Sequence, residues 1–394
     1  MSAAQGPPAQ PGPGPLLLTG ATGFLGMELL CRYLERSERH VYALVRARDE
    51  EQAAQRLRAA IERVCGDCER FAGRWTAVPG DICEPGLGVD VETRRRLGEE
   101  VDEILHGAAT VSFSLPLPES RKVNVEGTRR LLEFAEECQA EGGGLRHFSY
   151  VSTAYVAGDH PGSFSEDQLN VGQGFRNGYE RSKFEAEQLV QREAERLPVK
   201  VFRPSIIVGE RESGWTASFN VLYPPLKALE AGSSPVIPGR SSTPVDVVPV
   251  DFVADAVFEL AGEPAPSGEV NHLVAGPRAM TVGRLAVLAA SYFKRRVPRL
   301  IPPGLYRRLV HPILLRRSKG RRRRALERTE ALFPYFTMQV RFENRRTEER
   351  LRHAGLTAPP VDGYLHRLLD FAVAAGWGRR QLSRGEARRR AATG

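Results

Sequence analysis

The stretch LLLTGATGFLG, residues 16–26, decides the fold. It begins with three leucines, as a buried strand does, and it runs into MELLCRYLER, a segment with helical periodicity. Three glycines, Gly20, Gly23 and Gly26, recur between them at every third position. In a strand–turn–helix unit such glycines permit the tight turn, the approach of the backbone to a pyrophosphate, and close helix–strand packing. The stretch therefore predicts a dinucleotide site at a helix N-terminus.

Apolar runs alternate with helical segments along the chain outward from this stretch. Such alternation predicts a doubly wound parallel sheet, a Rossmann-type α/β fold with its ligand site at the carboxyl ends of the strands. The further predicted strands are residues 40–46, 75–82, 101–109, 145–153 and 199–209. We expect a Rossmann domain over residues 16–209 and a smaller, mainly helical substrate lobe over residues 210–394, from which residues 245–257 return to the first domain.

Composition limits the class of protein. No run of about 18 apolar residues occurs, so no transmembrane helix is expected. Residues 1–15, rich in Pro and Gly, are interpreted as a disordered leader, because they lack the apolar core of a signal peptide. The five cysteines form no secreted-scaffold pattern, which predicts reduced thiols and a cytoplasmic protein. The eight histidines show no metal-ligand spacing, and we expect no metal.

The net charge of +8 is unevenly distributed. Residues 281–394 carry 27 Lys and Arg against 8 Asp and Glu, whereas residues 1–280 carry 29 against 40. The most basic run is RRSKGRRRR, residues 316–324. This asymmetry favours an anionic partner: coenzyme A phosphates, an acidic carrier protein, or a membrane surface that the basic lobe would contact peripherally. A solvated arginine-rich surface is an equal alternative. No stacking aromatics are interleaved with the run, so no nucleic-acid partner is expected.

The end of the second predicted strand distinguishes NAD from NADP. A carboxylate there would hold the ribose 2′-hydroxyl, but this chain has Arg46 and Arg48 and no carboxylate before Asp49. A guanidinium can pair with a 2′-phosphate and stack on adenine, which predicts NADPH as the cofactor. Arg46 is the better candidate, and Arg48 is equally consistent with an exposed loop residue.

Tyr179 and Lys183 lie four residues apart in GYERSKFEAE, residues 178–187, and so share one face of a predicted helix. Alone, this spacing also fits two residues on a solvated helix. Thr153, however, ends the fifth predicted strand beside the expected nicotinamide. Lys183 would then lower the pKa of Tyr179 from about 10, and Tyr179 and Thr153 would hydrogen-bond a carbonyl oxygen as hydride arrives. Three other charged residues of this helix are assigned to its solvated face: Glu180, Arg181 and Glu185.

With these motifs, roughly residues 16–280 resemble extended short-chain dehydrogenases/reductases. They are most similar to the thioester-reducing branch, with its male-sterility-type NAD-binding domain, which includes fatty acyl-CoA reductases and the terminal reductase domains of carboxylic acid reductases and nonribosomal peptide synthetases. The segments that carry the resemblance are LLLTGATGFLG, VYALVRA, HGAATVSF, KVNVEGT, FSYVSTAYVAG and VDVVPVDFVADAV. The resemblance implies NADPH-dependent reduction of an acyl thioester, on coenzyme A or an acyl carrier protein, to an aldehyde, and to an alcohol with a second hydride.

The resemblance also implies roles for individual residues. The catalytic hydroxyl falls on Thr153 rather than Ser152, and Asn124 matches an asparagine that braces the active site, although a helix cap or turn is the alternative. The implied catalytic set is Thr153, Tyr179, Lys183 and Asn124. The predicted cofactor contacts are Gly20, Thr22, Gly23, Phe24, Leu25, Gly26, Arg46, Arg48, Asp81, Ile82, Gly107, Ala108, Ala109, Tyr179, Lys183, Pro204, Ser205 and Ile206.

Two other functions share these motifs. A hydroxysteroid- or sugar-nucleotide-type dehydrogenase or epimerase would differ only in its substrate lobe. An NADP-binding scaffold with a basic tail for nucleic acid or membrane would not need Thr153, Tyr179 and Lys183 together. The apolar side chains at the start of the substrate lobe either line an acyl chain or form core, and core is favoured: Trp215, Phe219, Leu222 and Tyr223.

Overall fold

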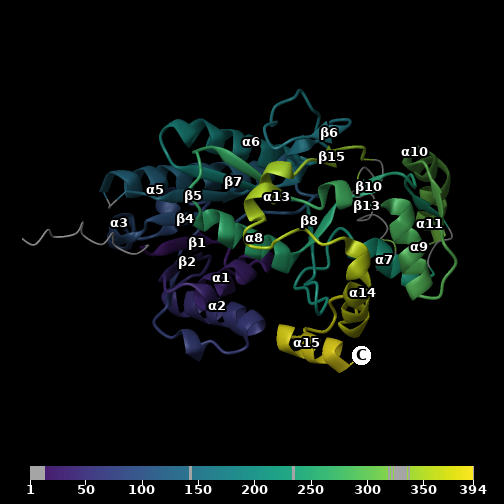
Figure 1. Ribbon diagram of the computed structural model, residues 1–394, viewed down its shortest axis with the longest axis horizontal. Helices are drawn as coiled ribbons and strands as arrows, with labels where there is room; N and C mark the ends of the chain where they lie inside the picture. Colours follow the sequence, from purple (N-terminus) through teal and green to yellow (C-terminus); the bar gives the residue numbers. More distant parts are fainter. Residues whose placement is uncertain are drawn as a thin grey trace, which may run out of the picture.

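A parallel sheet of seven strands lies at the centre of the computed structural model (Figure 1). The structure describes residues 14–141, 144–232, 236–317, 320, 323, 335 and 338–393, so most of the predicted leader lies outside it. The strands are β1 (Leu16–Thr19), β2 (Val41–Val45), β3 (Trp75–Pro79), β4 (Glu103–His106), β5 (His147–Val151), β7 (Val199–Pro204) and β12 (Glu269–Leu273). Their order is β12-β7-β5-β4-β1-β2-β3, so the winding direction reverses between β1 and β4, where such folds bind ligands.

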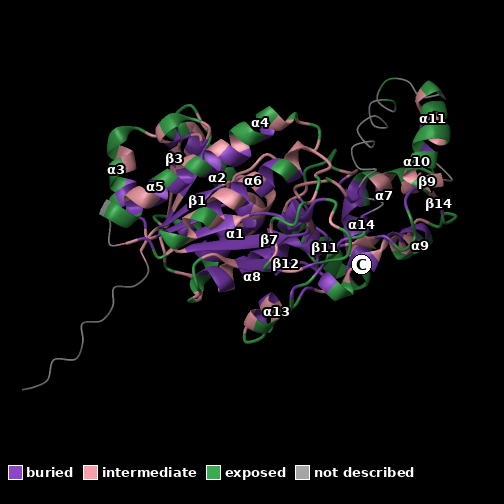
Figure 2. Cartoon of the chain, turned by 90° about the horizontal axis from the view of Figure 1, so that it is seen from above, coloured by how far each residue is buried: buried purple, intermediate pink, exposed green. Residues whose placement is uncertain are grey.

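Helices cover both faces of the sheet, as the doubly wound prediction requires. The helices α1 (Phe24–Arg36), α2 (Glu50–Cys65) and α8 (Val250–Gly262) pack on one face, and α3 (Val91–Glu100), α5 (Gly127–Glu141) and α6 (Gly178–Arg192) pack on the other. Successive side chains of a strand point to opposite faces. Leu16 and Leu18 of β1 accordingly join the α1 side, and Leu17 joins the α5 side. Figure 2 shows the resulting buried strands between helices that are exposed on their outer faces.

The predicted fold class is confirmed, and each of the six predicted strands is present. The sequence analysis missed β12, which pairs with β7 in parallel and extends the return to the Rossmann domain beyond residue 257. The sequence of β12 is EVNHL, and its Asn271 and His272 are buried. A strand with two buried polar residues lacks the apolar run by which the other strands are recognised.

The substrate lobe is mainly helical in its described part. Its principal helices are α7 (Tyr223–Glu230), α9 (Val282–Tyr292) and α14 (Leu365–Ala374). A short parallel pair joins it to the sheet domain, β8 (Ile206–Val208) with β11 (Val247–Pro249), and a second pair, β9 (Val236–Pro238) with β14 (Arg299–Ile301), lies within the lobe. Beyond β14 the chain continues through α10 (Pro303–Leu305) into α11 (His311–Arg317), at the edge of the lobe in Figure 1.

The basic C-terminal region is packed against the acidic first part of the chain. The buried Arg384 begins α15 (Arg384–Thr393) and pairs with Glu210 at 2.6 Å and with Glu28 at 3.5 Å. Arg350 likewise pairs with Glu263 at 2.8 Å. Part of the charge asymmetry is therefore neutralised within the chain. Most of the run RRSKGRRRR lies outside the described residues.

The expectation of five reduced cysteines is wrong for one pair. Cys31 of α1 and Cys65 of α2 form a disulfide, with their Cα atoms 6.4 Å apart. The two helices lie side by side on the same face of the sheet, which brings together cysteines 34 positions apart in the sequence. No cysteine pattern could reveal this, because the pairing depends on how the helices pack.

Within the described ranges, no helix has both the length and the apolar character that a membrane span requires. Nor does any group of three or more His, Cys, Asp or Glu side chains in the described part of the chain have an arrangement that could hold a metal ion.

Candidate active site

The glycine-rich loop lies where β1 and β4 end side by side. Gly20 has φ +79°, and a Cβ there would lie 2.7 Å from the amide nitrogen of Ala108 and from the carbonyl carbon of Gly107. A Cβ on Gly26 would lie 1.9 Å from the carbonyl oxygen of Gly20. Gly23 is the N-cap of α1. A Cβ at Gly20 or Gly26 would collide with backbone, so both positions require glycine for this turn and for the close approach of α1.

The other predicted cofactor residues of this loop and of β4 surround the same turn. Thr22, Phe24 and Leu25 are half-buried at the start of α1, and Ala109 is half-buried after β4. These residues contribute to one continuous edge at the carboxyl ends of β1 and β4.

The end of β2 exposes two guanidinium groups. Arg46 and Arg48 are both exposed and make no ion pair with a described carboxylate. The nearest acid, Asp49, is engaged elsewhere, because its carboxylate accepts the N–H of Gln52 at 2.8 Å and caps α2. The position where NAD-binding proteins place a carboxylate is thus basic in this chain.

The two predicted cofactor residues after β3, Asp81 and Ile82, differ in their burial. Asp81 is half-buried, and its carboxylate accepts the N–H of Cys83 at 2.9 Å. Ile82 is only 7% exposed and packs against Gly127 in the core, so its side chain mainly positions the loop.

A buried histidine joins the strand ends, and the sequence analysis assigned it no role. His106 Nδ1 lies 2.8 Å from Thr19 Oγ1, and its Nε2 lies 3.0 Å from Thr128 Oγ1. Burial lowers the pKa of His106 to about 3, so the ring is neutral and serves as a hydrogen-bonding spacer between β1 and α5. Thr19 Oγ1 also accepts the N–H of Ala108 at 3.2 Å, which holds the small residues against the loop.

Thr153 and Tyr179 meet beyond the end of β5. Thr153 is buried, and its hydroxyl donates to the carbonyl of Pro204 at 3.4 Å. Burial raises the pKa of Tyr179 to about 12, and a hydrogen bond with Thr153 acts in the opposite direction. Ser205 and Ile206 follow Pro204 into β8, and of these three predicted residues Pro204 contacts Thr153. The tyrosine is therefore held as a neutral donor.

Lys183 lies on the same helix but bonds to different groups from those expected. Its Nζ donates to the hydroxyl of Tyr150 at 2.7 Å and to the carbonyl of Val151 at 2.8 Å. Burial lowers the pKa of Lys183 to about 7. The predicted lowering of the Tyr179 pKa is wrong in this structure, because burial dominates and the ammonium is directed at β5. Tyr150 is a site residue that the sequence analysis missed, since it precedes Ser152 and Thr153 inside the strand.

Asn124 ties α6 to the loop after β4. It lies in a π-helical turn, Lys122–Glu126. Its Oδ1 accepts the N–H of Thr110 at 2.9 Å, and its Nδ2 donates to Thr110 O at 3.2 Å and to Ser182 Oγ at 2.9 Å. Ser182 stands between Tyr179 and Lys183. The geometry is that of a brace between two elements and differs from a helix cap.

Ser152 is directed away from Tyr179. Its hydroxyl donates to the buried carboxylate of Glu187, which pairs with Arg203 at 2.5 Å. Arg203 also lies 3.0 Å from His272 Nε2 of β12. This charged network therefore supports the end of β5, where Ser152 precedes Thr153. No sequence signal could have revealed this network, because Glu187 lies on a helix whose charged residues look solvent-exposed in the sequence.

Glu180 is buried, and its assignment to a solvated face is wrong. Its carboxylate accepts from the hydroxyl of Tyr335 at 2.6 Å and from the N–H of Arg176 at 3.0 Å. Tyr335 comes from the substrate lobe, so the residue next to Tyr179 contacts that lobe directly. Arg181 and Glu185, by contrast, form an ion pair at 2.7 Å on the outer side of α6.

The family of male sterility proteins matches residues 18–257, more than half of the chain. The chain belongs to the male sterility protein family. The proteins of this family are NAD(P)-dependent oxidoreductases of the extended short-chain dehydrogenase/reductase type, which confirms the resemblance.

Similar proteins include larger biosynthetic enzymes. The chain is 35% identical over 267 residues to an isonitrile lipopeptide synthase of Streptomyces coeruleorubidus, covering 66% of this chain and 18% of that protein. It is 32% identical over 295 residues to a carboxylic acid reductase of Mycobacterium tuberculosis, covering 66% and 24%. A solved structure, the terminal R domain from the myxalamid PKS-NRPS biosynthetic pathway, is 28% identical with a TM-score of 0.79, covering 93% of this chain and 92% of that chain.

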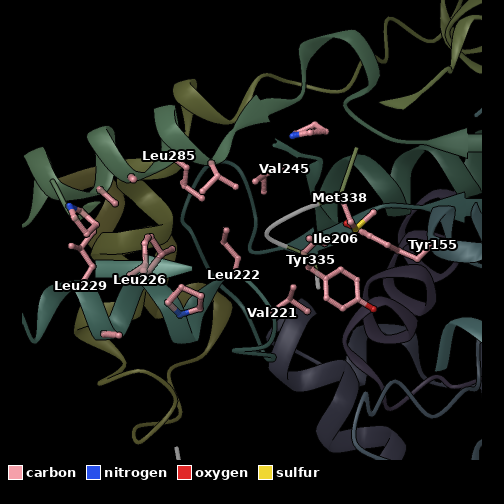
Figure 3. A pocket seen from close by; sticks show the side chains of 18 residues that line it. Tyr155, Ile206, Val221, Leu222, Leu226, Leu229, Val245, Leu285, Tyr335 and Met338 are labelled. Atoms are coloured by element: carbon pink, nitrogen blue, oxygen red, sulfur yellow. The ribbon is translucent and has the colours of Figure 1, made fainter. Parts of the chain in front are cut away.

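In this male sterility family member, an apolar pocket extends from Tyr155 into the substrate lobe (Figure 3). Tyr155 and Ile206 line it at one end, and Leu222 lines it farther in. Among the four residues whose role was left open, only Leu222 lines the pocket. The other three belong to the packing of the lobe: Trp215, Phe219 and Tyr223.

Proposed function

We propose that this chain is an NADPH-dependent reductase of an acyl thioester, with aldehyde and free thiol as its first products. The observation that carries the proposal is the convergence of Thr153, Tyr179 and Lys183 at the strand edge that also bears the glycine-rich loop. This chain covers less than a quarter of the length of two of its curated relatives. The proposal therefore rests on the site of this chain and on the chemistry of the family, and not on the activities of those whole proteins.

NADPH, when bound, supplies the hydride. Arg46 and Arg48 would hold its 2′-phosphate, and the glycine-rich loop at the N-terminus of α1 its pyrophosphate. Asp81 would accept a hydrogen bond from the adenine amino group. Thr153 and Tyr179 would donate hydrogen bonds to the acyl oxygen as negative charge develops on it, and the phenol would transfer its proton.

The resulting hemithioacetal would collapse to an aldehyde and a thiol. Lys183, with its pKa near neutrality, would anchor the ribose and return a proton to Tyr179. Asn124 would hold the helix that carries both residues. A second hydride would convert the aldehyde into an alcohol.

The thioester would reach this site on a carrier protein or as coenzyme A. The similarity to a terminal R domain of a PKS-NRPS pathway favours a carrier protein. Contact of the basic lobe with an anionic membrane is a further element of the proposal, motivated by the charge balance of residues 281–394. Measuring KM for each donor form at low and high salt tests these partners, because electrostatic docking weakens with ionic strength. A KM that salt leaves unchanged for every form would contradict them.

The function is tested by following NADPH consumption with acyl-CoA, acyl-carrier thioester, aldehyde, sterol and sugar-nucleotide substrates, with identification of the product. Tyr179→Phe should lower kcat at least about 100-fold, since it removes the proton donor. Its Kd for NADPH should stay within about twofold, because the tyrosine contributes little to ground-state binding.

Tyr42→Phe is the matched control, since Tyr42 bonds Glu100 far from the site, and it should leave kcat unchanged. Unchanged turnover in Tyr179→Phe would remove this residue from the mechanism. Oxidation of a sterol or sugar nucleotide, with no thioester reduced, would replace the proposed function by a hydroxysteroid- or sugar-nucleotide-type activity.

A further inference from the structure

The apolar pocket between the sheet domain and the substrate lobe has no use in the chemistry described so far. It encloses about 940 Å³ including the space at its mouth. Eighteen described residues line it, and none of them carries a charged or amide side chain. The only side-chain oxygens in this lining belong to Tyr155 and Tyr335. The Tyr335 hydroxyl is already engaged by Glu180 at 2.6 Å and Asn177 at 2.7 Å.

One end of the pocket is lined by Tyr155 and Tyr335, and these two residues connect it to Thr153 and Tyr179. Tyr155 lies two residues after Thr153, in the 3-10 turn that Thr153 caps. The ring of Tyr335 stacks on that of Phe113 at 5.1 Å, and Phe113 lies 5.5 Å from the ring of Tyr179. The substituent of a carbonyl held by Thr153 and Tyr179 would pass Tyr155 and Tyr335 to enter the pocket.

The other end lies between two helices of the lobe, as Figure 3 shows for Leu226 and Leu229 of α7 opposite Leu285 of α9. Ala286 and Ala289 belong to the same wall and lie three residues apart, on one face of α9. Both are nearly fully buried, so larger side chains at either position would occupy the space of the pocket.

We propose that this pocket takes the aliphatic chain of the acyl group, and that Ala286 and Ala289 set the longest chain it takes. The inference rests on the proposed thioester reductase function and specifies its substrate class. Each methylene moved from water into an apolar wall favours binding roughly threefold to fourfold. An aminoacyl or peptidyl group would lose its hydrogen bonds to water and find only the Tyr155 hydroxyl in the described lining, since that of Tyr335 is already engaged. Each polar group left unpaired disfavours binding roughly tenfold or more.

Chain length provides the first test. With butanoyl-, octanoyl-, dodecanoyl- and hexadecanoyl-CoA, kcat/KM should rise with length and then reach a limit. An aminoacyl or dipeptidyl thioester of matching length should be at least roughly tenfold poorer than its aliphatic counterpart. A flat series, or a preference for the peptidyl thioester, would overturn the inference while leaving the reductase function intact.

Substitutions in α9 test the wall. Ala286→Leu and Ala289→Leu should lower kcat/KM for hexadecanoyl-CoA at least about tenfold and leave butanoyl-CoA within about twofold, because only the long chain reaches them. Val287→Leu is the matched control, since Val287 lies on the same helix and is 45% exposed, and it should leave the series unchanged. Leu229→Ala enlarges the same end without overpacking, and should shift the limit toward longer chains. Equal losses at every chain length would show that these residues do not set the limit.

A binding measurement separates this inference from the function on which it rests. Displacement of the fluorescent fatty acid cis-parinaric acid by dodecanoic acid reports the pocket without any turnover. If no thioester is reduced but the probe binds the parent protein and binds Ala286→Leu much more weakly, the pocket assignment stands and the proposed function fails. If the probe does not bind the parent protein, the pocket assignment is overturned.

Discussion

Replacing Arg203 with methionine tests the charged network beneath the end of β5. Arg203 of β7 and Glu187 of α6 are both fully buried, with Nη2 and Nε of the arginine 2.5 Å and 2.9 Å from Glu187 Oε1. The second carboxylate oxygen accepts from Ser152, the residue before Thr153. In Arg203→Met the carboxylate stays buried without its cation.

The expected loss of unfolding free energy follows from this burial. Breaking a buried ion pair by removing one partner costs about 3–5 kcal/mol, because the remaining charge is uncompensated. A surface pair contributes about 0–1 kcal/mol. The pair Arg95–Glu92, whose side chains are 52% and 79% exposed, provides the matched control through Arg95→Met. The double variant Arg203→Met, Glu187→Leu removes both charges and should recover a large part of the loss.

Equilibrium unfolding in urea, followed by tryptophan fluorescence, measures these differences. A double-mutant cycle over Arg203 and Glu187 should give a coupling energy of at least about 2 kcal/mol. The reasoning would be refuted if Arg203→Met cost less than about 1 kcal/mol, as a surface pair does. It would also be refuted if the two single losses simply added, since the network would then not act as a pair.

Three further substitutions probe the nucleotide site and the buried lysine. Gly26→Ala should abolish NADPH binding in a fluorescence titration, because its Cβ would lie 1.9 Å from the Gly20 carbonyl oxygen. The control Gly262→Ala has nothing within 4 Å of the added Cβ and should bind NADPH normally. NADPH binding by both variants would contradict the loop geometry. Arg46→Ala should raise the Kd for NADPH about tenfold by removing a charge-assisted bond to the 2′-phosphate. It should leave the Kd for NADH unchanged. An equal rise in both Kd values would exclude the contact with the 2′-phosphate. Burial lowers the pKa of Lys183 from 10.5 to about 7, so between these values the folded protein binds fewer protons than the unfolded chain and its unfolding free energy rises with pH. In Lys183→Met that rise, measured by urea unfolding at several pH values, should become shallower, and an identical slope would show that Lys183 is not shifted.

Much of the sheet domain and its nucleotide loop could be predicted from the sequence. Strand and helix periods depend on residues a few positions apart, and β1, the glycines and α1 are contiguous in the chain. The spacing of Tyr179 and Lys183 is likewise a property of one helix. β12 escaped prediction because its two buried polar residues interrupt the apolar run, and His272 finds its partner Arg203 in a distant segment.

The side-chain partners inside the site could not be predicted in the same way. Glu180 and Glu187 look like solvated helix positions until Tyr335 and Arg203 are placed against them. Lys183 lies on the predicted face, but its hydrogen bonds go to Tyr150 and Val151, because β5 passes beneath α6.

The sequence by itself determined the Rossmann topology, the dinucleotide loop, the basic residues at the end of β2, and the hydroxyl, phenol and ammonium that would act on a carbonyl. Those features are local, or follow from the order of strands along the chain. Only the tertiary structure decided which charges are buried, that Cys31 meets Cys65, and that an apolar pocket leads away from Tyr155. The physical reason is that burial and pairing depend on how separate elements pack, and no sequence period encodes that contact.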